Sequence, residues 1–423
     1  MVVGIAYKIF QTMSSGVVPD DDSSDRLSYR ITVSILIVSS ILIGTKQLVG
    51  DPITCWIPAH FTGNHEHYTN SYCWVRNTYY LPWDENIPKE HEHDKRYMIT
   101  YYQWIPLILM VQALFFYLPR MLWVGLNKRV GIDVNLVMGN AVVLQNSQKY
   151  DQYTAILENM SYHLHRMFKR DNRRSKITIS IKSLLSRACC DVIGRRRGNY
   201  LIVLFLAHKL LYIANLLAQL FVLNYILGFD FNLYGFEVLK RLAQGREWVE
   251  TPFPRVTMCD MKIRRLGNVH RYAVQCVLPI NLYTEKLYLF QWFWFVLLLT
   301  LSCVEFLQWM FRILVWHKSR EDYIKKHLDL AKTHFDRDMV VEHADEFADE
   351  YLKQDGVFLL RLIAKNVSQS VTCMLTQELW KLFVPWYRNQ HPGIDDDDDA
   401  PEKARRPMYD PETLPLRSRA GRN

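Results

Sequence analysis

The sequence predicts a mainly helical membrane protein whose chain crosses the bilayer four times. Three observations support this fold class: four long apolar segments, an uneven distribution of Lys and Arg between the loops that join them, and pairs of cysteines in two of those loops. Hydrophobic residues make up 49% of the 423 residues and aromatic residues 13%, yet the mean hydropathy is close to neutral, at −0.10. A near-neutral mean hydropathy is expected when part of a chain is embedded in a membrane and another part is charged.

Four apolar segments are the candidate membrane spans. Each approaches the ~20 residues that cross a hydrocarbon core about 30 Å thick. One such segment is also compatible with a buried helix of a soluble protein, but four in one chain favour a membrane protein. The segments comprise residues 31–49, 103–125, 200–228 and 286–316.

The distribution of charge predicts how these spans are oriented. Residues 126–199 contain 14 Lys and Arg against 5 Asp and Glu, whereas residues 50–101 contain 4 Lys and Arg and residues 229–285 contain 8. Because loops rich in Lys and Arg stay in the cytosol, we expect residues 126–199 and both termini there. The net charge of +8 is therefore attributed to membrane orientation, and no nucleic-acid partner is expected.

The spans and their orientation divide the rest of the chain into regions. Charged residues with spaced apolar positions predict helices after the fourth span, and the run of acids at 395–399 with the Arg-rich end predicts a disordered tail. The regions are a cytosolic N-terminal helix and linker (1–30), outer loops (50–102 and 229–285), a cytosolic loop (126–199), a helical cytosolic region (317–390) and the tail (391–423).

Four cysteines lie in the two outer loops. Cys55 and Cys73 are in the first loop and Cys259 and Cys276 in the second, which predicts disulfides in an oxidising compartment. Residues 255–279 read as two strands, and a two-residue turn at Gly267–Asn268 would set Cys259 opposite Cys276. These two cysteines either bond each other or each bond a cysteine of the first loop. Four cysteines allow three connectivities, so the residues alone leave this open.

The border of the second span carries the sequence YYQWIP at residues 101–106. Tyr101, Tyr102 and Trp104 are expected in the headgroup layer, which amphipathic rings prefer. Pro106 and Pro119 are the candidate kink positions of this helix. Pro106 lies in the first turn, where a missing N–H costs little, whereas Pro119 lies deeper and should bend the helix.

Sites for metals, cofactors and catalysis are not expected. The spacing of His65–Glu66–His67 and His91–Glu92–His93 would suit a zinc or pH sensor if these residues lay on strands, but solvated loop histidines are the favoured interpretation. The sequence contains no Gly-rich phosphate loop, no nucleophile elbow and no recognisable pair of catalytic carboxylates. We therefore predict that the protein is not an enzyme.

Several charged residues lie in or beside the predicted spans. Lys209 and Glu305 should face the bundle interior or a pore, because buried charge is costly elsewhere. The depths inferred from the span limits differ, so no ion pair between them is predicted. Lys46, near the outer end of the first span, either lines a pore or extends its ammonium group to the headgroups, and the second is favoured.

Five sequence stretches resemble the innexins, the gap-junction proteins of invertebrates. YYQW at the start of the second span is the signature of that family, and Ile105 stands where Val is usual. The resemblance extends in order over residues 25–315. Its motifs are DRLSYRITV (25–33), DPITCW (51–56), YYQWIP (101–106), EWVETPFPRVTMCD (247–260) and EKLYLFQWFWF (285–295).

The resemblance implies ring-forming large-pore channels built from four-helix subunits with cytosolic termini. It implies homo-oligomeric rings, similar to eight-subunit assemblies, that dock with a ring of the neighbouring cell at plasma-membrane gap junctions and pass ions and small molecules. It also implies outer α/β loops stapled by the disulfides Cys55–Cys276 and Cys73–Cys259. Other innexins and membrane lipids are further expected partners, and no cofactor is expected.

The expected pore lies near the N-terminus. Residues 1–13 have apolar positions at helical spacing, and the resemblance favours a helix folded into the pore mouth over one lying on the membrane surface. Asp20, Asp21 and Asp22 either give the cytosolic vestibule its acidic groups or form a solvated linker that caps the first span. The candidate pore-lining or gating residues are Val2, Ile5, Lys8, Ile9, Asp20, Asp21, Asp22 and Lys46.

Two other functions compete with the gap-junction channel. An undocked channel that releases small metabolites would share the same pore, but the outer loops lack any N-x-S/T glycosylation site, which favours a surface that meets another protein closely. A four-span adhesion or scaffold protein is disfavoured by the large cytosolic part. In that part, Cys189 and Cys190 beside a basic block are either palmitoylated or, as is favoured, unmodified buried thiols.

Overall fold

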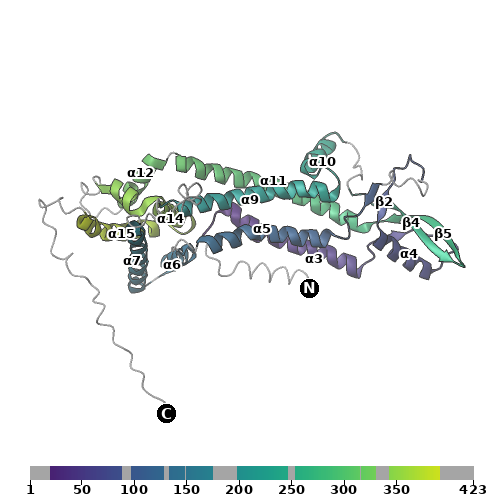
Figure 1. Cartoon of the computed structure of the whole chain (residues 1–423), viewed down its shortest axis with the longest axis horizontal. Helices are drawn as coiled ribbons and strands as arrows, with labels where there is room; N and C mark the ends of the chain where they lie inside the picture. The colour runs from purple at the N-terminus through teal and green to yellow at the C-terminus, as the bar shows by residue number, and fades with distance from the viewer. Residues whose placement is uncertain are drawn as a thin grey trace, which may run out of the picture.

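The computed structural model is elongated, with a bundle of long helices in the middle, a β-sheet at one end and shorter helices at the other (Figure 1). We call these ends the sheet end and the helical end. The structure describes residues 20–87, 97–127, 133–147, 149–174, 198–245, 253–314, 316–329 and 343–390.

Four helical segments are long and apolar enough to cross a membrane, as the sequence predicts. The first segment begins at Ser23 and the fourth at Pro279, both earlier than the apolar windows suggest. An apolar window marks the part of a helix that suits hydrocarbon, whereas the helix itself continues until its backbone hydrogen bonds end. The segments are α2–η1–α3 (Ser23–Arg26, Leu27–Thr32 and Val33–Val49), α5 (Ile105–Asn127), α9 (Tyr200–Leu227) and α11 (Pro279–Leu314).

Buried amides join three of these helices. Gln112 of α5 donates a hydrogen bond to Gln219 of α9 at 3.2 Å, and Gln291 of α11 donates to Gln112 at 3.1 Å. A bilayer core offers no water to an amide, so amides there need partners on neighbouring helices. Outside this interior α5 exposes apolar side chains such as Leu114 and Leu107, which is the surface expected toward lipid or a neighbouring subunit.

The sheet end is a five-stranded antiparallel sheet in the order β1-β5-β4-β2-β3, with helix α4 (Gly63–Arg76) against it. Both outer loops contribute, because the first loop supplies β1, β2 and β3 and the second supplies the β4–β5 hairpin. The strands are β1 (Thr54–Cys55), β2 (Thr78–Tyr80), β3 (Tyr97–Ile99), β4 (Val256–Arg265) and β5 (Asn268–Val277).

The hairpin turns one residue earlier than the sequence analysis expects. Arg265 pairs with Asn268, so the turn residues are Leu266 and Gly267, with φ of 50° and 84°. A two-residue turn with positive φ at both positions matches the twist of the flanking strands, and Gly267 takes the second position. Consequently Cys276 lies opposite Thr257 rather than opposite Cys259.

Two further parts complete the fold. Beyond α9, the second outer loop forms η5 (Phe231–Leu233) and α10 (Tyr234–Ala243), whose Gly235 lies so close to Trp292 that a Cβ would be 2.0 Å from the indole. The predicted helical region after the fourth span is present and packs against helices of the loop between α5 and α9. This helical end comprises α6 (Val134–Asn146), α7 (Tyr150–Arg174), α12 (Trp316–Asp329), η6 (Phe347–Leu352), α14 (Lys353–Asn366) and α15 (Gln369–Gln390).

Candidate functional site

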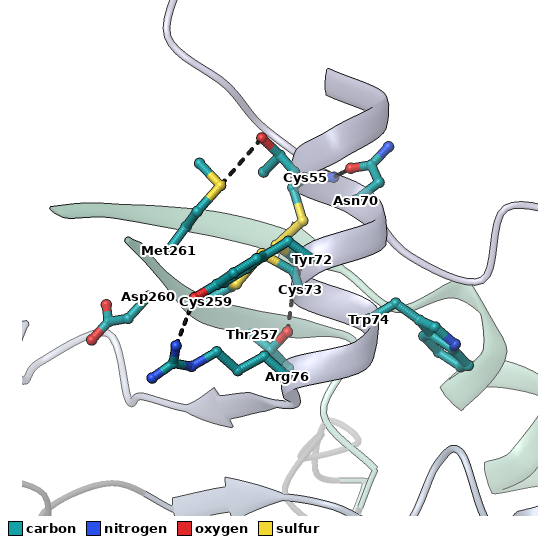
Figure 2. Close-up of a disulfide and its surroundings, with 12 residues drawn as sticks. Cys55, Asn70, Tyr72, Cys73, Trp74, Arg76, Thr257, Cys259, Asp260 and Met261 are labelled. Carbon is teal, nitrogen blue, oxygen red and sulfur yellow. Dashed lines mark hydrogen bonds between the residues drawn. A yellow bond between two sulfur atoms is a disulfide. The ribbon is translucent and has the colours of Figure 1, made fainter. Parts of the chain in front are cut away.

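Two disulfides join the two outer loops at the sheet end. Cys55 of β1 bonds Cys276 of β5, and Cys73 of α4 bonds Cys259 of β4, across sequence separations of 221 and 186 residues. Figure 2 shows α4 lying across the sheet with Cys73 directed at Cys259. These are the pairs that the resemblance implies. All four cysteines are buried, so the bonds form the centre of the small core beneath α4.

The YYQW stretch connects the second span to this end of the molecule. Tyr101 and Tyr102 are buried and only Trp104, 59% exposed, remains available to a headgroup layer. The Tyr102 hydroxyl donates to the carbonyl of Trp74 at 3.2 Å, and the Gln103 amide donates to the same carbonyl. The expectation for the two tyrosines was therefore wrong: Tyr102 and Gln103 fix α5 against the end of α4, because buried polar groups need partners there, and Tyr101 packs edge-to-face against Phe253.

A cluster of buried charges lies at the other end of the spanning helices. We call it the charge cluster, and its centre is Lys209 of α9, whose side chain is 1% exposed. Its ammonium group lies 2.9 Å from Asp22, 2.8 Å from Asp25 and 2.8 Å from Glu305 of α11. The members of the cluster are Asp20, Asp21, Asp22, Asp25, Arg120, Lys209, Glu305 and Lys365.

The ion pair between Lys209 and Glu305 was missed by the sequence analysis. Helix α9 starts at Tyr200 and α11 ends at Leu314, at the same end of the bundle. Lys209 is as many residues from Tyr200 as Glu305 is from Leu314. Because the helix rise is constant, equal counts from the same end of the bundle place both residues at one depth. The sequence analysis placed the end of the fourth span at Trp316, so Lys209 and Glu305 were assigned different depths.

The acidic residues before the first span are part of this cluster. Arg120 of α5 lies 2.6 Å from Asp20 and 3.2 Å from Asp21, and the indole of Trp123 donates to Asp20 at 2.9 Å. Asp20, Asp21 and Asp22 are fully buried, so in the subunit they neither face a vestibule nor form a solvated linker. Carboxylates enclosed by four helices are stable only when cations and N–H groups surround them.

Asp22 is the member that connects most parts of the chain. Its carboxylate accepts hydrogen bonds from the indole of Trp309 at 2.7 Å and from Lys365 of α14, in addition to the Lys209 contact. Its own backbone N–H donates to the Asp25 carboxylate at 3.3 Å, so the predicted capping of the first span does occur here. Asp22 thus links the first, third and fourth spans to the helical end.

The two neighbouring carboxyls respond differently to burial. Burial raises the pKa of Asp21 to about 7, because the attraction of Arg120 offsets only part of the desolvation. Burial also raises the pKa of Asp22, but Lys209 and Lys365 together lower it further, so the pKa ends below its ordinary value. Asp22 is therefore ionised at neutral pH, whereas Asp21 titrates near it.

Comparison with known proteins identifies the family. A family model described as Innexin matches residues 21–383, most of the chain. The chain belongs to the innexin family. It is 37% identical over 370 residues to innexin unc-9 of Caenorhabditis elegans (86% of this chain, 92% of the relative), and 36% identical over 362 residues to innexin-3 of the same species (85% and 83%). Innexin-19 of Caenorhabditis briggsae is 33% identical over 391 residues (86% of each chain).

Innexins form the channels of gap junctions, so this innexin is a channel-forming, multi-pass membrane protein of gap junctions. The family is not enzymatic. The disulfide-bonded loops and every member of the charge cluster except Asp20 fall inside the matched residues, which places both ends of the spanning bundle within the family architecture.

The structure places the other predicted residues of this innexin as follows. His65 and His67 lie on helix α4 and not on a strand, and the His65 ring lies 2.7 Å from the hydroxyl of Thr62, at the start of that helix. Residues that are two positions apart on a helix point in different directions, so His65 and His67 do not form the metal-binding pair considered above. Val2, Ile5, Lys8, Ile9, the second His pair (His91, His93), Cys189 and Cys190 lie outside the described residues.

Three residues of the spans retain their predicted positions. Pro106 is in the first turn of α5, where its carbonyl accepts a hydrogen bond from Ser40 at 2.7 Å, and Pro119 is buried inside the same helix. The bends at these prolines stay a prediction. Lys46 is partly exposed near the sheet end of α3, with its ammonium group against Gly50.

Proposed function

We propose that eight copies of this innexin form a ring that docks, sheet end first, with a ring of the neighbouring cell. The docked pair then passes ions and small molecules between the two cytosols. One observation carries this proposal: two disulfides fasten both outer loops into a single sheet at one end of the spanning bundle. A rigid rim of this kind suits contact with a second ring, because a preorganised surface loses little entropy on binding.

The same disulfides support the orientation. Disulfides persist in oxidising compartments and are rare in the cytosol, so the sheet end is extracellular. Both termini and the helical end are then cytosolic in this proposal, which the even number of candidate spans and the excess of Lys and Arg in residues 126–199 support. Labelling single cysteines with a membrane-impermeant reagent tests this: Leu266→Cys should react on intact cells and Lys381→Cys should not.

The N-terminal segment is proposed as the gate of each subunit. Val2, Ile5, Lys8 and Ile9 belong to a short helix in the pore mouth, as the resemblance implies. The charge cluster supports this, because it fixes residues 20–22, which directly follow this segment, beside the ends of the second, third and fourth spans. Deleting residues 2–13 should change single-channel conductance or voltage dependence, and unchanged currents at normal surface expression would refute the gate.

The main test is the junctional conductance between two voltage-clamped cells that express only this innexin. Coupling that disappears in Cys276→Ser, while the protein still reaches the surface, supports the docking channel. Large currents in single cells without any coupling would support an undocked channel instead. The number of subunits is tested separately by the rotational symmetry of purified rings in electron-microscope images.

A further inference from the structure

One face of the β4–β5 hairpin is covered and the other is not. Helix α4 covers the face that carries Cys259 and Met261, where the Thr69 hydroxyl contacts the Met261 sulfur at 3.6 Å. The alternate residues of β4, Met258, Asp260, Lys262 and Arg264, point to the opposite face, because successive side chains of a strand alternate. Lys262 and Arg264 are exposed there.

Charge is distributed unevenly along this open face. Lys262 and Arg264 lie on it, and Arg271, which pairs with Lys262 across the hairpin, forms an ion pair with Asp260 at 2.7 Å. Positive charge is therefore in excess on the far part of the hairpin. Near its base the face is acidic, since Asp84 and Glu85 are exposed in the segment after β2. Among the described residues, no ion pair is found for either of these two acids.

The base of the same face is also hollow. A cavity of about 250 Å³ lies between Met258 and Gln275 of the hairpin and the segment that contains Trp83 and Glu85. Trp83 is 83% exposed beside it. An exposed tryptophan at the rim of a pocket is a frequent anchor of protein–protein interfaces.

The tip of the hairpin has the complementary shape. Leu266 is 96% exposed in the turn, and the hairpin is the part of the molecule farthest from the helical end (Figure 1). At ~3.4 Å per residue, Met258 and Arg264 lie about 20 Å apart along β4. Two copies of this face packed antiparallel would therefore bring each basic tip against the acidic, hollow base of the other, as a two-fold symmetric contact requires.

We propose that this open face is the docking surface between two copies of this chain in facing membranes. Leu266 of one copy enters the hollow beside Trp83 of the other, and Lys262 and Arg264 lie against Asp84 and Glu85, with the same contacts repeated by symmetry. The inference rests on the proposed function, which supplies the facing copy. The inference adds how the two subunits are aligned. The second outer loop of one subunit contacts the first outer loop of the opposite subunit, and the two hairpins do not contact each other.

The test uses two charge-reversed forms and unequal cell pairs. The tip form carries Lys262→Glu and Arg264→Glu, and the base form carries Asp84→Lys and Glu85→Lys. A control form reverses Lys240 and Arg241 of α10, which lie in the same loop but outside the open face. Single-cell currents and surface labelling establish that each form folds and reaches the membrane, and junctional conductance is then measured for every pairing.

The proposal makes a distinct prediction for each pairing. Tip with tip and base with base should both lose at least about tenfold in conductance, because every contact is repulsive and small rim energies add over the ring. Tip with base should recover most of the wild-type conductance, because both sets of contacts are again attractive. The control form should couple normally, and Leu266→Ser, which keeps all charges, should reduce coupling without changing single-cell currents.

Other outcomes overturn the inference in recognisable ways. If the tip form couples better with wild type than wild type does with itself, the hairpins meet each other. If all pairings couple equally, this face does not dock, although the channel proposal stands. If wild-type cells fail to couple while single-cell currents are present, the docking function itself is wrong and the inference falls with it.

Discussion

The two ends of the spanning bundle are stabilised in contrasting ways. At the sheet end, two covalent bonds join the outer loops, whereas at the opposite end the charge cluster joins the four spans and α14 through ion pairs. Both arrangements connect distant parts of the chain, since the Asp22 to Lys365 contact spans 343 residues and the Cys55–Cys276 bond spans 221. The ion pairs depend on the protonation state of each member, whereas the disulfides do not titrate.

This difference suits the two tasks proposed for the ends. A docking rim should keep one shape, and disulfides restrict the unfolded chain without depending on pH near neutrality. A gate must have more than one arrangement, and a buried ionic network changes its balance when one partner is removed. Removing one connection at a time should therefore affect the two ends differently.

The largest effect is expected for Lys209→Met. This change leaves Asp22, Asp25 and Glu305 buried without their shared cation, which should cost about 3–5 kcal/mol of unfolding free energy. We expect a sharp fall in surface expression and in the melting temperature of the purified protein. Lys240→Met, at an exposed position of α10, is the matched control. Equal melting temperatures for the two variants would show that the cluster is not stabilising.

The second effect concerns the covalent end. Replacing Cys73 and Cys259 together by Ser should cost about 2–5 kcal/mol, because the unfolded chain regains the freedom that this bond removes. Coupling between cells should fall, and an impermeant external reductant should remove more coupling from the wild type than from the variant, in which Cys55–Cys276 is the bond left for it to break. Cys303→Ser, which removes a free cysteine of α11, should behave as wild type. A reductant effect of the same size in the double variant and in the wild type would contradict this assignment.

Sequence reasoning succeeded where the signal was local. Four apolar windows predicted the four spans, and a turn between alternating strands predicted the β4–β5 hairpin, because both depend on neighbouring residues. The turn was misplaced by one residue, since Leu266–Gly267 and Gly267–Asn268 both offer a glycine. The disulfide pairs came only from the family resemblance, because pairing depends on how remote loops meet.

The charge cluster could not be predicted in the same way. Lys209 and Glu305 were recognised as unusual, but Arg120, the one charged residue of the predicted span 103–125, was overlooked, and Lys365 lies outside the predicted spans. Their role depends on which helix faces they occupy and on helix ends that differ from the apolar windows by several residues. A check for charged residues at equal counts from the same end of each span would have found the Lys209–Glu305 pair.

A smaller effect is expected for Lys365→Met, which breaks the contact between Asp22 and the helical end. Asp22 keeps Lys209, and the Lys365 side chain is partly exposed, so the loss should be about 1–2 kcal/mol. Because this weakens the connection of α14 to the start of the first span, where the Arg26–Asn366 hydrogen bond of 3.3 Å remains, the voltage dependence of single-cell currents should shift. Lys381→Met, which removes a surface pair with Glu378, is the control. Identical voltage dependence in both variants would show that α14 does not influence the gate.

The smallest effect is a pH dependence that originates at Asp21. Its pKa is raised by burial to about 7, so the folded protein holds a proton that the unfolded chain has already lost at that pH. Stability should therefore fall as the pH rises toward and through 7, by less than about 1 kcal/mol between pH 6.5 and 7.5. Asp21→Asn removes this proton uptake, so its melting temperature should vary less over the same interval and exceed that of the wild type most clearly at the alkaline end. A variant that follows the wild type in parallel across this range would assign the titration to another group, and the ionic end would then be as insensitive to pH as the disulfide-bonded one.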